Sequence, residues 1–347
     1  MKSTSSLSRL AGAVIGGAAA LGVDLVSPLL GAPTALAVPF CAAPPAVRVL
    51  RLRLGILECA IVDADGRLFV SNQNSHGLAG SVMRIDHPDA EPIELAAPIP
   101  SPGGLAFDDS GHLIAGFGDS VFRGLAGNLV GLAGLLRIDP NNGQRKTLAT
   151  GLAMANGVAR ATDGTIFASN DCGTHIDRVD PDGRVHRQWA KVPSANGLAI
   201  DSAGRYLYAS QTFVPAAIKR IEIADPANIT LHTQPPPLAR GALLDGLAID
   251  DADSLFVAAN GAGQIWRVDP DGTICALARG LRCPSMVALG RGRTGFQAGN
   301  LYAVTFHGDV IEFERCAERL RSRPLGNADR TTRGAPRPPS RPRVRPR

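Results

Sequence analysis

The stretch Glu58-Cys-Ala-Ile-Val-Asp63-Ala-Asp65-Gly66-Arg-Leu-Phe-Val-Ser-Asn72 contains two short apolar runs separated by a D-x-D-G turn. This pattern predicts two antiparallel strands joined by a tight turn, because strands alternate their side chains and Asp-Gly suits a hairpin. The same frame returns five times, with first residues Gly103, Asn156, Asn196, Asp245 and Ser285. Successive frames start 45, 53, 40, 49 and 40 residues apart.

Each of the first five frames continues into a third apolar run that carries a basic residue and ends in an acidic one. These runs are Met83-Arg84-Ile-Asp86, Leu136-Arg137-Ile-Asp139, Asp177-Arg178-Val-Asp180, Lys219-Arg220-Ile-Glu222 and Trp266-Arg267-Val-Asp269. Turns such as Asp269-Pro-Asp-Gly272 follow and lead to a fourth short run. Four short strands repeated at this period predict an all-β, six-bladed β-propeller with four antiparallel strands per blade.

The sixth frame has no fourth strand at its C-terminal end, since the apolar pattern stops after 310–313. An alternating run at 47–54, just before the first frame, supplies the missing strand. We therefore expect an N-terminal strand in blade six to close the ring and remove its exposed edges. This topology places Cys41 and Cys316 at the same end of blade six and predicts a disulfide between them. Cys59, Cys172, Cys275 and Cys283 are left unassigned, with buried thiols as the simple alternative.

The two ends of the chain predict export and a disordered tail. Residues 1–37 combine basic Lys2 and Arg9 with an apolar run and an Ala35-Leu-Ala37 cleavage motif, as in a signal peptide. A membrane anchor is the alternative, but Asp24, Pro28 and Pro33 interrupt the run. We expect a secreted, extracellular propeller over 38–320, with no transmembrane segment after signal removal, and a disordered Pro/Arg-rich tail over 321–347. The tail carries much of the formal charge of +5, so no nucleic-acid partner is expected.

The frame-starting residues should converge, because the first strand of each propeller blade lines the central channel. Four of them are Glu58, Asn156, Asn196 and Asp245, which offer oxygen atoms only. Such ligands suit Ca²⁺ or another hard divalent cation, and two acids balance its charge. Asn-Gly and Asp-Gly are also ordinary turn dipeptides. Glu58 in an apolar stretch is harder to explain that way, because an unpaired buried carboxylate is costly.

These motifs resemble the gluconolactonase/regucalcin-like family of six-bladed propellers over about residues 47–315. The resemblance implies a catalytic divalent cation, usually Ca²⁺, held by Glu58, Asn156, Asn196 and Asp245. It also implies hydrolysis of a small-molecule lactone or ester, in which the cation polarises the carbonyl and Asp245 is a possible general base. Sugar-lactone hydrolases of the family often carry Arg where this chain has Met154. That departure predicts a more apolar pocket and argues against an aldonolactone.

The second strand of each blade returns to the same mouth of the channel and brings further polar residues. As substrate-binding candidates we name Asn72, Asn170, Ser210, Gln211 and Asn260. The loops after these strands carry His76, His175 and His307, of which His76 and His307 are catalytic candidates. Exposed loop histidines are the simpler interpretation. The Gly/Leu-rich segment 117–135 could cover an apolar substrate, although a long hairpin is the simpler expectation.

Three functions follow from these observations. The first is a secreted, Ca²⁺-dependent hydrolase of lactones or related esters, acting as a monomer. The second is a non-catalytic propeller whose cation is structural and whose mouth binds a peptide or glycan. The third is a strictosidine-synthase-like enzyme, which is disfavoured because it gives Glu58 and Asp245 no purpose. The fold alone does not separate them, since propellers support many functions.

Overall fold

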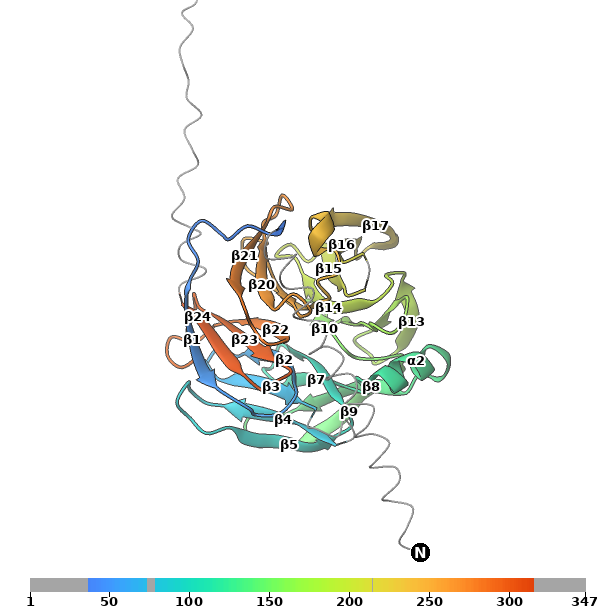
Figure 1. Ribbon diagram of the computed structural model, residues 1–347. Coiled ribbons are helices and arrows are strands. Elements are labelled where there is room, and N and C mark those ends of the chain that lie inside the picture. The colour runs from blue at the N-terminus through green and yellow to red at the C-terminus, as the bar shows by residue number, and fades with distance from the viewer. Residues whose placement is uncertain (1–36, 74–78, 214, 315–347) are drawn as a thin grey trace, which may run out of the picture.

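A computed structural model describes residues 37–73, 79–213 and 215–314, which form six four-stranded antiparallel sheets arranged in a ring (Figure 1). The strands of the first three blades are β2 (Leu57–Val62), β3 (Leu68–Asn72), β4 (Gly80–Ile85), β5 (Ile93–Ile99), β6 (Pro102–Phe107), β7 (Leu113–Phe117), β8 (Ala133–Ile138), β9 (Arg145–Leu152), β10 (Val158–Arg160), β11 (Ile166–Ala168), β12 (Ile176–Val179) and β13 (Val185–Ala190). The last three blades contain β14 (Ala195–Ile200), β15 (Tyr206–Gln211), β16 (Ala217–Glu222), β17 (Asp225–Thr233), β18 (Leu244–Ile249), β19 (Leu255–Ala259), β20 (Gln264–Val268), β21 (Ile274–Arg279), β22 (Pro284–Leu289), β23 (Leu301–Thr305), β24 (Val310–Glu314) and β1 (Ala46–Arg51). A short 3₁₀ helix, Pro237–Ala239, precedes β18. The predicted six-bladed propeller is confirmed.

The apolar core lies between the blades and not on the ring axis. Leu57 and Val70 of blade one pack with Tyr302 and Val304 of blade six, and similar buried clusters join the other neighbouring blades. Each sheet can therefore bury apolar side chains on both of its faces. The axis of the ring is left to residues of other chemistry.

Ring closure follows the predicted path. The strand β1 pairs antiparallel with β24, from Ala46 opposite Glu314 to Arg51 opposite Val310, and becomes the outer strand of blade six. Figure 1 shows the N-terminal strand β1 beside the C-terminal strand β24. The N-terminal strand thus supplies the fourth strand that the sixth frame lacks.

The predicted disulfide is wrong, because Cys41 pairs with Cys275 and not with Cys316. Before it reaches blade six, the N-terminal segment runs along β21, the outer strand of blade five. Phe40 forms a parallel bridge with Ala276, and the Cys41 amide donates to the Ala276 carbonyl at 3.0 Å. This extra pairing brings Cys41 opposite a cysteine of blade five. Cys316 lies outside the described residues.

The segment 117–135 is not a hairpin loop. It contains a ten-residue α-helix, α2 (Val121–Val130), between the second and third strands of blade two, and Gly131 ends the helix in a left-handed conformation. The sequence does not predict this helix, because the segment is rich in Gly and Gly has low helix propensity. No helix in the described part of the chain is long and apolar enough to cross a bilayer. The predicted signal peptide (1–37) lies outside the described residues except for its last position, and the tail (321–347) lies wholly outside them.

Candidate metal and active site

The frame-starting residues turn into the channel because the first strands are irregular there. The pairing of first and second strands slips at the position of Glu58, at Asn196 and at Asp245, as in β-bulges. Bulges re-aim side chains and are common next to active sites. The residue two positions before the frame is left-handed in four blades, with φ of 45°, 55°, 51° and 46° at Ser101, Ser194, Leu243 and Cys283. This kink precedes the first strand in those four blades.

The glycine that follows each Asn or Asp is required by close packing of neighbouring blades. A Cβ atom at Gly157 would lie 2.2 Å from the Asn196 carbonyl oxygen, and one at Gly197 would lie 2.5 Å from the Leu247 amide nitrogen. Asn196-Gly197 and Asp245-Gly246 lie inside strands β14 and β18. The ordinary-turn interpretation of these dipeptides is therefore wrong. The glycines let first strands approach each other around the axis.

The four predicted ligand residues meet at one small cavity of about 30 Å³ on the ring axis. Glu58, Asn156, Asn196 and Asp245 line it and are at most 9% exposed. Its apolar lining comes from Cys59, Leu105, Val158, Leu198 and Met286. The cavity has room for an ion or a water molecule. A whole lactone would have to lie above it, toward the mouth.

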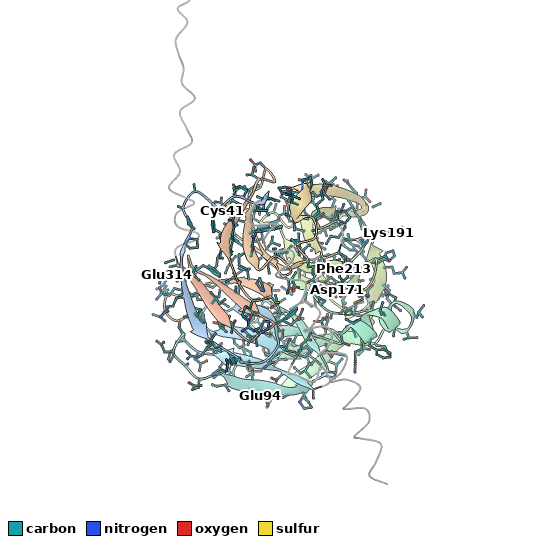
Figure 2. All side chains as sticks on the ribbon, in the orientation of Figure 1. Cys41, Glu94, Asp171, Lys191, Phe213 and Glu314 are labelled. Carbon is teal, nitrogen blue, oxygen red and sulfur yellow. A yellow bond between two sulfur atoms is a disulfide. The ribbon has the colours of Figure 1, made fainter. Side chains whose placement is uncertain are left out.

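Two further carboxylates belong to this site, and the sequence analysis missed both. Asp119 follows β7 in blade two and is 3% exposed, and Asp171 follows the second strand of blade three. Figure 2 places Asp171 toward the middle of the ring. They lie two and three residues beyond the ends of second strands, and this register position is the sequence signal that points to them.

Burial raises the pKa of all four acids, and repulsion from neighbouring acids adds to the shift for Glu58, Asp119 and Asp245. Burial raises the pKa of Glu58 well above its usual range, and Asp119 and Asp245 add to the shift. Burial also raises the pKa of Asp245 well above its usual range, with Asp171 and Asp119 contributing, and raises that of Asp119 to about 8. Burial raises the pKa of Asp171 as well. Within the described ranges, no basic side chain hydrogen-bonds to Glu58 or Asp245.

Amide groups hold the acids in place and leave oxygen atoms for the cavity. The Asn156 amide nitrogen donates to Asp119 Oδ1 at 3.1 Å and to Glu58 Oε1 at 3.4 Å. Its carbonyl oxygen is therefore turned away from both acids. Asn260 Nδ2 donates to Asp245 Oδ2 at 3.1 Å, and Gln73 Nε2 donates to Asp119 Oδ2 at 2.8 Å.

The donor set fits a hard divalent cation. Carboxylate and amide oxygens are the ligands that Ca²⁺ prefers, and a cation would relieve the repulsion that raises these pKa values. The Asp171 Oδ1 atom is buried without a hydrogen-bond partner, although the residue as a whole is partly exposed. In the described part of the chain, no three His, Cys, Asp or Glu residues form a metal cluster. A cation here would therefore need the amide oxygens of Asn156 and Asn196 as well as the carboxylates.

Serines in or just after second strands fix the backbone of the ligand residues. Ser169 Oγ donates to the Asn196 carbonyl at 2.5 Å, and Ser210 Oγ donates to the Asp245 carbonyl at 2.6 Å. Each serine belongs to the blade before the ligand that it holds. Ser210, a predicted substrate-binding residue, thus uses its hydroxyl group to hold the backbone of a ligand residue.

The other substrate-binding candidates have structural hydrogen bonds of their own. Asn72 Nδ2 donates to the Leu54 carbonyl at 2.8 Å, and Gln211 Nε2 donates to the Pro215 carbonyl at 2.9 Å. Asn170 Nδ2 donates to the Gly124 carbonyl at 3.2 Å and so holds helix α2 on blade three. Asn260 contacts Asp245, as described above. Contact of these residues with a substrate stays a prediction.

The histidine candidates do not contact the acids in the described structure. His307 Nδ1 lies 2.8 Å from an Arg282 guanidinium nitrogen, and His175 Nδ1 lies 2.8 Å from Thr174 Oγ1. His76 lies outside the described residues. Met154 is 3% exposed, and a Cβ at Gly124 of α2 would lie 2.8 Å from its sulfur. Met154 therefore supports the helix and does not line the cavity.

Comparison with known proteins gives a family match over part of the chain. Residues 170–306 match a family profile described as the SMP-30/gluconolactonase/LRE-like region. The chain carries an SMP-30/gluconolactonase/LRE-like region. The predicted resemblance is thereby confirmed. Asn196 and Asp245 lie inside this region, whereas Glu58 and Asn156 precede it. A comparison with curated proteins found no match.

Solved structures share the fold of this chain. A regucalcin from Agrobacterium tumefaciens, described as a calcium-binding protein, is 18% identical with a TM-score of 0.60, over 80% of this chain and 95% of that one. A gluconolactonase from Xanthomonas campestris is 17% identical with a TM-score of 0.59, over 80% and 96%. A virginiamycin B lyase from Staphylococcus aureus is 17% identical with a TM-score of 0.51, over 78% and 88%. At these identities the likeness shows the fold, and the site must carry the functional argument.

Proposed function

We propose that this propeller is a secreted, divalent-cation-dependent hydrolase of small-molecule lactones or related esters, with Ca²⁺ as the expected cation. The observation that carries the proposal is the convergence of Glu58, Asn156, Asn196 and Asp245 on one axial cavity. Four acids lie at or near this cavity without a basic partner among the described residues, and they are Glu58, Asp119, Asp171 and Asp245. A divalent cation would supply the missing positive charge.

Each residue of the site has a separate role in the proposed hydrolysis. Glu58, Asn156, Asn196 and Asp245 would hold the cation, which when bound would polarise the substrate carbonyl. Asp245 accepts the proton of the attacking water, while Asn260 orients its carboxylate. The water oxygen bonds to the carbonyl carbon and the acyl C–O bond of the substrate breaks. The leaving oxygen takes up the proton from Asp245, so that one water is consumed for each hydroxy acid formed from a lactone.

A cysteine nucleophile is not part of this proposal. Cys59 lines the cavity, but burial raises the pKa of its thiol to about 12. Its sulfur also accepts a hydrogen bond from the Leu105 amide at 3.3 Å. At neutral pH the group is therefore a thiol, and the thiolate is the nucleophilic form.

Hydrolysis of a panel of lactones and aryl esters, measured with Ca²⁺ and with a chelator, tests the proposal. We expect activity that the chelator removes and that added Ca²⁺ restores. Glu58→Gln and Asp245→Asn should each lose both calorimetric Ca²⁺ binding and turnover, because each removes a charged ligand. Asp251→Asn removes a carboxylate on the opposite end of the ring and should keep both. Wild-type activity in either site variant would contradict the assigned residues.

The non-catalytic alternative gives a different result in the same experiment. A propeller with a purely structural cation would bind Ca²⁺ through the same residues but hydrolyse no member of the panel. That outcome would refute the hydrolase and keep the metal site.

A further inference from the structure

Helix α2 presents its apolar side away from the protein, which is the reverse of an ordinary surface helix. Val121, Phe122, Leu125 and Leu129 are 47%, 66%, 59% and 83% exposed. At 3.6 residues per turn they fall within an arc of about 100°. Gly124 and Gly127 occupy the buried side of the helix.

The contacts of α2 fix which way this apolar stripe faces. The helix begins next to Asp119 at the channel, and Gly131 at its far end packs on Gly151 of β9, the outer strand of blade two. A Cβ at Gly127 would lie 1.8 Å from the Ala153 carbonyl oxygen, so the buried side lies flat on the ends of the strands. The helix therefore forms a ridge across the face where the channel opens, with the stripe pointing away from the ring. Figure 1 shows it reaching the edge of the ring.

We call this surface the mouth face. Its described residues lie in the loops at 52–56, 73, 79, 100–101, 118–132, 153–157, 169–175, 191–194, 212–213, 215–216, 234–243, 260–263, 280–283 and 306–309. Phe213, 51% exposed, adds an aromatic side chain to it, and Figure 2 places Phe213 toward the middle of the ring. Leu132 and Val130 extend the exposed apolar area beyond the stripe, at 39% and 65%. The apolar surface of the mouth face is thus spread from the ring centre to its edge.

The exposed charges among the described residues of the mouth face are all positive. Its exposed charged residues are Arg53, Lys191, Arg240 and Arg282, and Arg123 on α2 is partly exposed. Its described carboxylates, Asp119, Asp171 and Asp309, are buried or partly buried. The opposite face carries the D-x-D-G and related turns, with exposed acids at Asp65, Asp109, Asp163, Asp182, Asp251 and Asp271. The exposed charges are therefore positive on the mouth face and mostly negative on the opposite face, which also carries the exposed arginines Arg184, Arg205, Arg291 and Arg293.

We propose that the mouth face docks on an anionic lipid bilayer, with the apolar stripe of α2 and Phe213 entering the interface. The cations come from loops between several different blades, so a flat anionic surface meets all of them at once. A globular partner seated on the ridge would contact only a few. The stripe has no hydrogen-bonding group, as expected for a helix that lies in a lipid interface. Docking would open the channel toward amphiphilic molecules in the membrane, but the proposal does not rest on the hydrolase activity.

Vesicle co-sedimentation of the whole protein tests this, with vesicles of equal parts phosphatidylglycerol and phosphatidylcholine against pure phosphatidylcholine. We expect binding to the anionic vesicles, and weakening at about 0.5 M salt, because surface charges are screened within a few ångströms there. Leu129→Asp should weaken binding at least roughly tenfold, since it places a negative charge in the interface. Leu231→Asp, at a 54% exposed leucine of β17 on the ring's outer edge, is the matched control and should bind like the wild type.

A second pair of variants separates the contribution of surface charge to vesicle binding from that of apolar contact. Lys191→Glu on the mouth face should weaken binding roughly fivefold or more, and Arg184→Glu on the opposite face should not. Equal binding by Leu129→Asp and the wild type would overturn the proposal. A second result would also overturn it: the wild type does not bind anionic vesicles but self-associates in ultracentrifugation, and Leu129→Asp is monomeric. In that case a second copy of the chain would cover the apolar stripe. None of these measurements uses turnover, so their failure is separable from failure of the proposed reaction.

Discussion

Removing the Cys41–Cys275 disulfide should destabilise the protein by a large and measurable amount. The bridge joins residues 234 positions apart, and in the chain-entropy model a loop of that length restricts the unfolded state by about 5 kcal/mol. The N-terminal segment is also held by non-covalent contacts, since the Ala276 amide donates to the Pro39 carbonyl at 2.8 Å and Arg279 stacks on Phe40 at 3.9 Å. These contacts hold residues 39–40 against β21 independently of the covalent link.

Urea unfolding of Cys41→Ser, Cys275→Ser and the double variant measures the effect. We expect each single variant to lose several kcal/mol, and the double variant to lose no more than one of them, because all three remove the same bond. A reducing agent should destabilise the wild type and leave the double variant unchanged. Hydrogen exchange should quicken in β1 in the variants, as the outer strand of blade six opens more often. Single variants as stable as the wild type, or peptide maps that pair Cys41 with Cys316, would refute the assignment.

Three further predictions concern the axial site and its support. The Ca²⁺-free protein should lose stability as pH rises from about 4 to about 8, because Asp119 has a folded pKa of about 8, above its usual 3.8, and is protonated only in the folded state across that window. Thermal unfolding at a series of pH values with a chelator measures this. If the stability of Asp119→Asn depends on pH as that of the wild type does, the prediction is contradicted. Asp119→Asn should also lower Ca²⁺ affinity roughly tenfold in calorimetry, since Asn156 loses a carboxylate that orients its amide. Gly157→Ala should lower the free energy of unfolding in urea by about 3 kcal/mol, because its Cβ would lie 2.2 Å from the Asn196 carbonyl oxygen. Gly111→Ala is the control: its Cβ would meet nothing within 4 Å, so it should lose only about 1 kcal/mol because of its positive φ.

Features repeated in every blade could be predicted from the sequence. The frame that begins at Glu58 sets both the strand alternation and the position of the channel-facing residue, so six copies determine the ring and its axis. Asn156, Asn196 and Asp245 follow from the same register, and the structure brings all four to one cavity. The N-terminal closing strand could also be predicted, because an incomplete last blade needs a partner.

Features that occur once needed the tertiary structure. The partner of Cys41 depends on the route of the N-terminal segment along β21, and no repeat records that route. Asp119 and Asp171 join the site because their loops fold over the channel, outside the first-strand register. Helix α2 forms although its sequence is rich in glycine, because only glycines fit against the strand ends beneath it. Short-range patterning thus determined the ring and its ligand positions by repetition, while contacts between segments far apart in sequence decided the clasp, the extra acids and the apolar ridge.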